Sequence, residues 1–403
     1  MTQIAELNVL VPKGWAIKKL KYVASLQSGD TISPEAITDA GQFPVFGGNG
    51  FRGFTEDFTH EGDYALIGRQ GALCGNINYA SGRFWASEHA IVADTHGKAD
   101  VRWLGELLRS MNLNQYSQSA AQPGLAVDVI ANLPVLVPPF DSQTAISTFL
   151  ADQTKPIDQL VAAKQKLLEL LAEKRRAMVA NAVTRGLDLN VPLRDSGVPW
   201  LGQIPTHWRT ERARWLFRER DERSPSGQEE MLTVSHLTGV TPRSEKDVNM
   251  FEAETTEGYK LANAGDLVIN TLWAWMGAMG VARVPGIVSP AYHVYEPLPV
   301  LDPDYIDVLV RIPVFAQEVT RYSKGVWSSR LRLYPEGFFE VYLPVPPLEE
   351  QERIVEHIRR ETKRLDELRH ATEKTIELLK ERRAALISAA VTGQLDLGGA
   401  LAR

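Results

Sequence analysis

The sequence predicts an α/β protein in which two globular α/β domains are separated by two long antiparallel helices (a coiled coil), with a pseudo-twofold internal repeat. Two observations predict this architecture. The second half of the chain repeats the first half, and the best-matched part of the repeat has the periodicity of a long amphipathic helix. With 403 residues, of which 44% are hydrophobic and 23% charged, the chain has the composition of a globular protein of several domains.

The repeat becomes visible when 208 is added to a residue number. Val-Pro-Pro at 137–139 returns at 345–347, and AVTRGLDL at 182–189 returns as AVTGQLDL at 390–397. About half of the positions in 158–189 are identical to those 208 residues later. Upstream, the match is weaker: EGDYALIG at 61–68 resembles AGDLVINT at 264–271, and Trp15 aligns with Trp208. The order A-B-A′-B′ predicts domains at 1–141, 142–190, 191–348 and 349–403.

The B segments are predicted to be helices. Apolar residues from 157 to 179 and from 365 to 387 recur at spacings of three and four, which is typical of one helix face. At least 27 residues in each copy correspond to a rod of about 40 Å. A lone helix with so narrow an apolar stripe is marginally stable, so we expect the copies to pack on each other. A generic helical hairpin is the alternative.

The direction of the helices follows from connectivity. The first copy leads from A to A′ and the second ends the sequence, so we expect the two to run antiparallel. Pro156 is a departure from the repeat, because its counterpart is Arg364. Proline inside a helix costs about 3 kcal/mol, which predicts either a kink at Pro156 or a helix that begins there, capped by Asp152 or Thr154.

PVLVPPFDSQ at 134–143 is similar to the [Asn/Asp]-Pro-Pro-[Tyr/Phe] motif of amino-methyltransferases. The first position of that motif must accept a hydrogen bond from the target amino group, and Val137 and Val345 accept none. The repeated Pro-Pro followed by Asp141 or Glu349 indicates a stiff strand exit and then a helix N-terminus, where acidic residues are favoured. We therefore interpret this stretch as a junction between A and B.

Other chemical motifs are absent or weak. FPVFGG followed by Asn49-Gly50 fits part of an S-adenosylmethionine loop, but Asn-Gly between two strands is equally a tight turn. The eight histidines lack metal-ligand spacing, and the sequence has no P-loop. Cys74 is the only cysteine, and no apolar run reaches the roughly 18 residues of a membrane span. Together with the lack of a signal peptide, this predicts a cytoplasmic, non-membrane binding protein.

Several motifs resemble the specificity subunit of type I restriction–modification systems. They are WLGQIPTHW (200–208), AWMGA (274–278), GIVSPAY (286–292) and the two Pro-Pro-x-[Asp/Glu]-x-Gln…Ala-Val-Thr blocks. The resemblance covers nearly the whole chain. It implies a non-enzymatic antiphage-defence protein whose two target recognition domains each read one half of a bipartite sequence in double-stranded DNA.

The resemblance also implies partners and the cofactors they carry. The helical pair would set the gap between the half-sites, at about 40 Å or roughly one turn of B-DNA, and would dock two methyltransferase subunits. Two restriction/translocase subunits would complete the complex. S-adenosylmethionine, ATP and Mg²⁺ would belong to these partners and none to this chain. For docking we single out the helical leucines Leu160, Leu167, Leu171, Leu368, Leu379 and Leu386.

The best candidate for DNA contact is the window 321–338, because the net charge of −6 requires any phosphate-binding surface to be local. Four basic residues fall within twelve positions that hold no acidic residue. The alternative is a solvated basic strand. The matching window in the first domain is 116–125, where Gln122 lies 208 residues before Arg330. The candidates are Arg321, Lys324, Ser328, Ser329, Arg330 and Arg332 in the second domain and Ser119 and Gln122 in the first.

Secondary candidates are Arg69 and Gln70 in GRQGALCGN (68–76), and Arg52. Trp273 and Trp275 could lie at a DNA surface, although alternating tryptophans are more typical of a strand core. Two other functions stay open at this point. A single-chain DNA adenine methyltransferase with a built-in recognition domain would methylate without partners, and a helical scaffold would not bind DNA at all.

Overall fold

The structure is a computed structural model and describes residues 11–71, 73–117, 124–188, 190–245, 255–325 and 331–395. The chain divides into two compact units: unit 1 is Met1–Gln165 with Glu373–Arg403, and unit 2 is Lys166–Thr372. Both boundaries fall inside long helices, α3 (Phe140–Arg185) and α7 (Leu348–Val391). Each unit therefore holds one globular α/β domain and half of each helix. The four-domain division stays a prediction.

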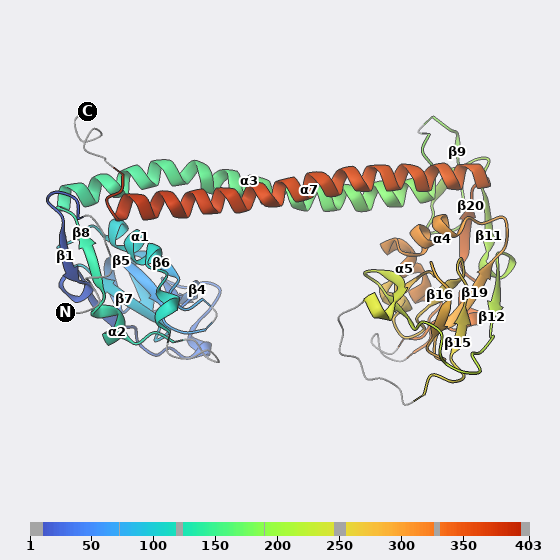
Figure 1. The fold of residues 1–403 in the computed structure, drawn as a ribbon, viewed down its shortest axis with the longest axis horizontal. Helices are drawn as coiled ribbons and strands as arrows, with labels where there is room; N and C mark the ends of the chain where they lie inside the picture. Colours follow the sequence, from blue (N-terminus) through green and yellow to red (C-terminus); the bar gives the residue numbers. More distant parts are fainter. Residues whose placement is uncertain are drawn as a thin grey trace. The chain divides into compact units, whose positions relative to one another are not determined.

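The globular part of unit 1 is a sheet with the strand order β2-β7-β5-β6-β3-β4, in which β3 and β6 are parallel and the other neighbours antiparallel. Helix α1 packs on β5 and β6 (Figure 1). The last residues of β5 are apolar without alternation because both faces are covered. Ile67 packs with Trp103 of α1, while Leu66 packs with Phe84 on the other face.

A two-stranded pair, β1 with β8, leads from this sheet to α3. The bounds in unit 1 before α3 are β1 Ala16–Lys19, β2 Ser25–Ser28, β3 Phe43–Gly47, β4 Gly50–Thr55, β5 His60–Gly68, β6 Ile77–Ala86, β7 Ala90–Asp94, α1 Val101–Ser110, α2 Val127–Ala131 and β8 Pro134–Val137, with 3₁₀ turns η1 Leu20–Tyr22, η2 Pro34–Ala36 and η3 Leu113–Tyr116.

Unit 2 has the same plan with shorter strands. Its main sheet has the order β12-β19-β16-β17, and α4 packs on β16 and β17. The pairs β9–β10, β11–β20, β13–β14 and β15–β18 surround it. The bounds are β9 Leu193–Asp195, β10 Gln203–Pro205, β11 Arg209–Arg212, β12 Phe217–Arg220, β13 Leu232–Ser235, β14 Gly239–Pro242, β15 Lys260–Ala262, β16 Leu267–Ile269, β17 Met279–Val281, β18 Gly286–Val288, β19 His293–Pro297, α4 Pro303–Val310, α5 Pro313–Arg321, α6 Pro335–Phe338 and β20 Tyr342–Val345, with 3₁₀ turns η4 Ala213–Trp215, η5 Arg243–Glu245 and η6 Ala274–Met276.

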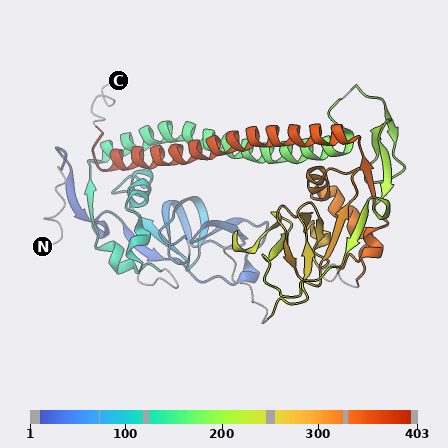
Figure 2. The same cartoon turned by 45° about the vertical axis from the view of Figure 1, so that its right-hand side comes forward.

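Helices α3 and α7 run side by side and antiparallel, as predicted (Figure 1, Figure 2). In unit 1, Arg383 Nε of α7 donates to Asp158 Oδ1 of α3 at 2.7 Å. In unit 2, Arg175 Nη1 of α3 donates to Asp366 Oδ1 of α7 at 2.9 Å. From the first pair to the second, the residue number rises from 158 to 175 in α3 and falls from 383 to 366 in α7, as expected for antiparallel helices.

The alternative in which a helix begins at Pro156 is wrong. Helix α3 has 46 residues and contains Pro156 in its interior. The hydroxyl of Thr154 donates to the Leu150 carbonyl oxygen at 2.7 Å, a bond within the helix and not a cap. Because the tight pairing with α7 supports the helix on both sides of this position, packing overrides the local cost of the proline.

The junctions between strand and helix are built around two buried glutamines. The Gln143 side chain accepts from the Asp100 backbone N–H at 2.8 Å and donates to the Pro138 carbonyl oxygen at 2.9 Å. Gln351, 208 residues later, makes the same two bonds to Asp302 N–H and Pro346 O, also at 2.8 and 2.9 Å. The Pro-Pro motif is therefore a structural junction in both copies, and Val137 lies in β8 opposite Ala16.

Candidate nucleic-acid interface

Three connections meet at one end of the unit 1 sheet: the β3–β4 turn, the loop from β5 to β6, and the turn that leads into β7. Arg69 N–H donates to the His89 carbonyl oxygen, and Arg69 O accepts from Leu125 N–H, both at 2.9 Å. A Cβ on Gly48 would lie 2.9 Å from His89 O. Glycine is therefore needed for the β3–β4 turn to approach the other loops so closely.

Predicted side chains lie on these loops. Gln70 is exposed, and its Oε1 lies 3.1 Å from His89 Nδ1. Arg52 is exposed on β4, and its Cδ covers Gly47, where an added Cβ would approach it to 2.5 Å. Arg69 is half-buried. The structure thus brings Arg52 of β4, which lies against Gly47, near Arg69 and Gln70, which lie against Gly48, although they come from separate stretches of the sequence.

Two buried polar atoms beside these loops have no hydrogen-bond partner among the residues that the structure describes: Asn78 Nδ2 and Glu88 Oε2. Asn78 lies against Gly50 of the β3–β4 turn, and Glu88 precedes His89. An unsatisfied buried polar group costs about 1–3 kcal/mol, and such groups are rare in folded proteins. Both atoms lie at the loop cluster that carries the candidate DNA-contacting residues, so this part of the fold includes groups that lower its stability.

Unit 2 contains the equivalent junction. Leu333 N–H donates to Thr271 O at 3.1 Å, as Leu125 N–H does to Arg69 O in unit 1. Leu125 and Leu333 are 208 residues apart. Just before Leu333, Lys324 and Arg332 exchange two backbone hydrogen bonds of 2.9 Å. The basic window and the tryptophan loop, two separate candidates in the sequence, are therefore joined in the fold.

Trp273 and Trp275 lie in and beside a surface turn and not in a strand core, so that interpretation is wrong. Trp273 is 50% exposed and precedes the 3₁₀ turn η6, and its ring lies 6.1 Å from that of Trp275 at an angle of 24°. The segment whose alternating hydrophobic side chains resembled a strand forms the 3₁₀ turn η6, which packs against α5.

Beside Trp273 is a groove of about 600 Å³. Asn270 Nδ2 donates to the Tyr292 hydroxyl at 3.0 Å within it. His236 and Arg243 also line the groove. The sequence held no signal for these two residues, because they are brought to it by the β13–β14 hairpin, whose pairing is a tertiary feature.

The basic window carries partly compensated charge. Arg321 pairs with Glu318 at 3.1 Å and Lys324 with Glu336 at 3.2 Å, and both basic side chains are about two-thirds exposed. Arg332 is exposed and has no ion pair among the described residues. The Lys324–Glu336 pair is exposed on both sides and is worth about 0–1 kcal/mol, so a phosphate group can displace the Glu336 carboxylate at little cost. Glu318 is buried, so its pair with Arg321 costs more to break. Five predicted contact residues lie outside the described residues: Ser119, Gln122, Ser328, Ser329 and Arg330.

A family model for the type I restriction modification DNA specificity domain matches residues 12–170. This range contains the unit 1 loop cluster and the first half of α3. Residues 12–170 are therefore similar to the specificity domain of type I restriction–modification systems.

Two curated proteins are also similar to this chain. The chain is 40% identical over 137 residues to the specificity subunit of the type I restriction enzyme EcoprrI from Escherichia coli, a match that covers 33% of this chain and 34% of that protein. It is 23% identical over 330 residues to the putative specificity subunit S.HindORF215P from Haemophilus influenzae, covering 78% and 79%. The chain thus spans about a third of the first relative and most of the second.

Solved structures show the same fold. A chain from a structure on the assembly and conformational transition of the type I R-M system matches with a TM-score of 0.69 at 16% identity, covering 96% of this chain and 100% of that one. The HsdS subunit from Thermoanaerobacter tengcongensis matches with a TM-score of 0.55 at 16% identity, covering 97% and 100%. Two α/β domains and a helical pair are therefore the fold that this chain shares with those solved structures.

The predicted helical leucines divide into two kinds in the structure, exposed and at least partly buried. Leu160 and Leu368, equivalent in the repeat, are 45% and 46% exposed. Leu171 is buried between the helices at 8%, and Leu167 is half-buried. In unit 1, Leu160 borders a groove of about 300 Å³ between the helices that Leu379, Leu386, Pro156 and Ile157 also line. Further exposed apolar side chains repeat at the same offset: Leu170 with Leu378 and Phe140 with Leu348.

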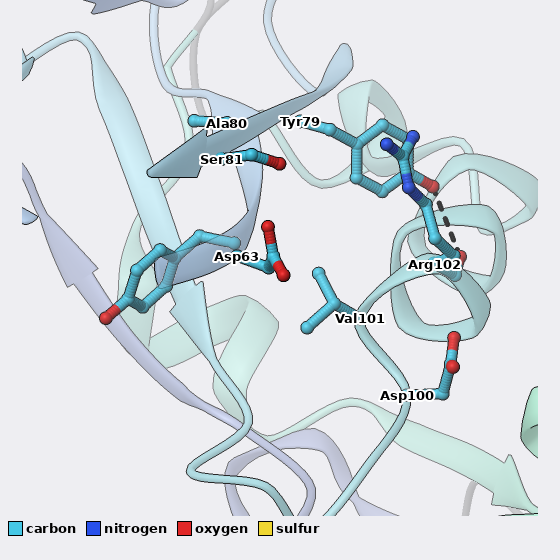
Figure 3. A pocket seen from close by; sticks show the side chains of 8 residues that line it. Asp63, Tyr79, Ala80, Ser81, Asp100, Val101 and Arg102 are labelled. Atoms are coloured by element: carbon cyan, nitrogen blue, oxygen red, sulfur yellow. Dashed lines mark hydrogen bonds between the residues drawn. The ribbon is translucent and has the colours of Figure 1, made fainter. Parts of the chain in front are cut away.

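A second hollow in unit 1, of about 300 Å³, lies between β5, β6 and the start of α1 (Figure 3). Tyr79 donates to Glu106 at 3.0 Å and lies 3.2 Å from the Arg102 carbonyl oxygen, and the Arg102 guanidinium lies 4.1 Å from its ring centre. Burial, and then the Glu106 carboxylate, raise the pKa of Tyr79. A Cβ on Gly105 would lie 2.3 Å from the tyrosine hydroxyl. We interpret this cluster as packing that fixes α1 on the sheet.

Within the described ranges, no group of three or more His, Cys, Asp or Glu side chains is placed to hold a metal ion. The helices in the same ranges are also too short or too polar to cross a membrane.

Proposed function

We propose that this chain is the non-catalytic DNA-reading subunit of a type I restriction–modification complex. Each unit reads one half of a bipartite, asymmetric target in double-stranded DNA. The observation that carries the proposal is the repeated loop junction, Leu125 on Arg69 in unit 1 and Leu333 on Thr271 in unit 2. A duplicated scaffold with different side chains around it is what two unlike half-sites require.

The two faces differ in their chemistry. Around the unit 1 junction lie the amide of Gln70 and the guanidinium of Arg52. Around the unit 2 junction lie Trp273, Lys324 and Arg332. Glutamine makes bidentate contacts with adenine, arginine with guanine or phosphate, and tryptophan offers apolar area. Two faces of this kind favour different base sequences.

The helical pair is proposed to set the gap and to dock two methyltransferase subunits. Exposed apolar side chains at the same offset in both helices, such as Leu160 and Leu368, provide two equivalent docking surfaces, one for each subunit. Helices of 46 and 44 residues are about 69 and 66 Å long at 1.5 Å per residue. Each helix is therefore longer than the 40 Å expected from the repeat, and nearer two turns of B-DNA than one.

Catalysis is assigned to partners. S-adenosylmethionine would be bound by the methyltransferase subunits, and ATP and Mg²⁺ by two restriction/translocase subunits. The alternative, a single-chain adenine methyltransferase, requires a hydrogen-bond acceptor where Val137 pairs with Ala16 in β8. A scaffold that does not bind DNA is the second alternative.

The test combines methylome sequencing with purified components. Methylome sequencing of cells that carry or lack this chain together with a methyltransferase partner identifies the methylated target. Fluorescence anisotropy then measures binding of that duplex to the chain with the methyltransferase subunits, beside duplexes in which one half-site is scrambled. We expect each scrambled half-site to weaken binding, and no methylation by the chain alone. Methylation without partners would establish the first alternative, and binding unaffected by either scramble would contradict the proposal.

A further inference from the structure

Unit 2 contains a tryptophan, Trp200, that packs between helix α5 and strand β20. Trp200 lies in the segment that precedes β11, and its Nε1–H donates to the Tyr342 carbonyl oxygen of β20 at 3.2 Å. Its ring meets Phe315 of α5 edge-on at 5.5 Å. The neighbouring side chains Val198 and Leu201 are buried in the same core. Trp200 therefore bridges β20 and α5 on this side of unit 2.

The equivalent place in unit 1 is an open groove of about 390 Å³. It is lined mainly by apolar side chains of β1, α1, β8 and α7, and Ile17 at its edge is 47% exposed. Pro134, 208 residues before Tyr342, supplies the carbonyl group at the position that accepts from Trp200 in unit 2. Leu107, Met111 and Val391 also face the groove. The two units thus share a socket, filled in one and open in the other among the described residues.

The chain that leads into the socket is equivalent in the two units. Trp208 packs beside Gly186, just after α3, and Trp15 packs beside Gly393, just after α7. Each tryptophan is followed directly by the strand that borders the socket, β11 or β1. Trp200 precedes Trp208 by eight residues, and Leu7 precedes Trp15 by eight residues. The residues around Leu7, namely Ile4, Val9 and Leu10, are also apolar.

We propose that this groove of unit 1 is the docking site of the chain's own N-terminal segment, Met1–Leu10, with Leu7 in the place that Trp200 takes in unit 2. Removing the exposed apolar wall from water is the driving force. A leucine fills the socket with less volume than an indole and makes no hydrogen bond to Pro134 O. The docked segment is therefore held less firmly than the Trp200 segment, and it opens more readily.

The experiment measures the reaction rate of a thiol placed at the groove edge. The full-length variant Ile17→Cys is treated with a maleimide, and the parent chain, whose only thiol Cys74 is 4% exposed, gives the background. Lys18→Cys, exposed on the opposite face of the same strand, is the matched control. We expect Ile17→Cys to react about ten-fold more slowly than Lys18→Cys, and the further change Leu7→Asp to raise its rate to that of the control.

Circular dichroism of each variant verifies that the fold is retained. Equal rates for Ile17→Cys and Lys18→Cys, unchanged by Leu7→Asp, would overturn the proposal. Protection that grows with protein concentration would identify a second copy as the occupant. Protection that appears only when methyltransferase subunits are added would identify the partner, and both results contradict docking of the chain's own segment.

Discussion

Asp158 of α3 and Arg383 of α7 form an ion pair whose duplicate is also present in the molecule. Adding 208 to Asp158 gives Asp366, and subtracting 208 from Arg383 gives Arg175, and these two residues form the second pair. Only an antiparallel arrangement with matched register lets one duplicated sequence satisfy both pairs. The two bonds thus report the internal pseudo-symmetry of the helical pair directly.

The first prediction concerns these pairs. Asp158→Ala and Arg383→Ala should each destabilise the chain by about 0.2–1 kcal/mol, because exposed ion pairs contribute little. Urea unfolding of the single and double variants gives the coupling energy, which should fall in high salt. Arg175→Ala with Asp366→Ala is the symmetric repeat. A coupling energy near zero for both pairs would show that they do not set the register.

The buried glutamines are expected to matter far more. Gln143→Ala should destabilise unit 1 by about 2–4 kcal/mol, because it leaves the Asp100 N–H and the Pro138 carbonyl group buried without partners. Gln351→Ala should have a similar effect in unit 2. Gln153→Ala, an exposed position on α3, is the control and should change stability by less than about 0.5 kcal/mol. Equal losses at positions 143 and 153 in denaturant unfolding would refute the role given to the junction.

Trp273 is expected to contribute to DNA binding without supporting the fold. Trp273→Ala should raise the dissociation constant for the specific duplex about ten-fold, since half-exposed aromatic side chains at an interface are frequent anchors. Its melting temperature should stay close to that of the parent. Trp215→Ala, 66% exposed on the turn η4, serves as the control in the same anisotropy measurement. Loss of binding by both variants would assign the effect to something other than the loop.

Arg332 is expected to contact phosphate. Arg332→Ala should lower the affinity for specific and unrelated duplexes alike, and should reduce the slope of log K against log salt by about one. Arg218→Ala, exposed in β12, controls for the loss of one positive charge. An unchanged slope for Arg332→Ala would exclude a phosphate contact. A loss confined to the specific duplex would indicate a base contact instead.

The stability of unit 2 should depend on pH through His293. Burial lowers its pKa below the ordinary value of 6.5, and the nearby Lys260 adds to this, while Glu219 and Asp221 oppose it. Because the unfolded chain binds the proton more tightly, stability should rise as pH increases through the window from the lowered pKa to about 6.5. Urea unfolding between pH 5 and 8 tests this. His293→Asn should flatten that rise, and a rise that persists unchanged would assign it to other groups, such as the half-buried His60, whose pKa is also lowered by burial.

Much of the architecture was predictable because it is encoded locally or by duplication. The helical periodicity, the offset of 208 and the Pro-Pro junctions need no knowledge of distant contacts, and the structure confirms the antiparallel pair they predict. The interior position of Pro156 was not predictable, because local propensity favours a helix boundary there and packing against α7 overrides it. The tryptophan loop was misread for a related reason: alternation of large side chains has the same appearance in a strand and in a turn packed by a neighbouring helix.

The sequence alone determined that two related domains alternate with two related helices, since duplication leaves its record residue by residue. Only the tertiary structure decided which loops meet. Arg69 joins Leu125, and Thr271 joins Leu333, through backbone hydrogen bonds between segments more than fifty residues apart. Such bonds involve groups that every residue carries, so no residue type marks them in advance. The same reason explains why the filled socket of Trp200 and the open groove beside Ile17 became visible only in the fold.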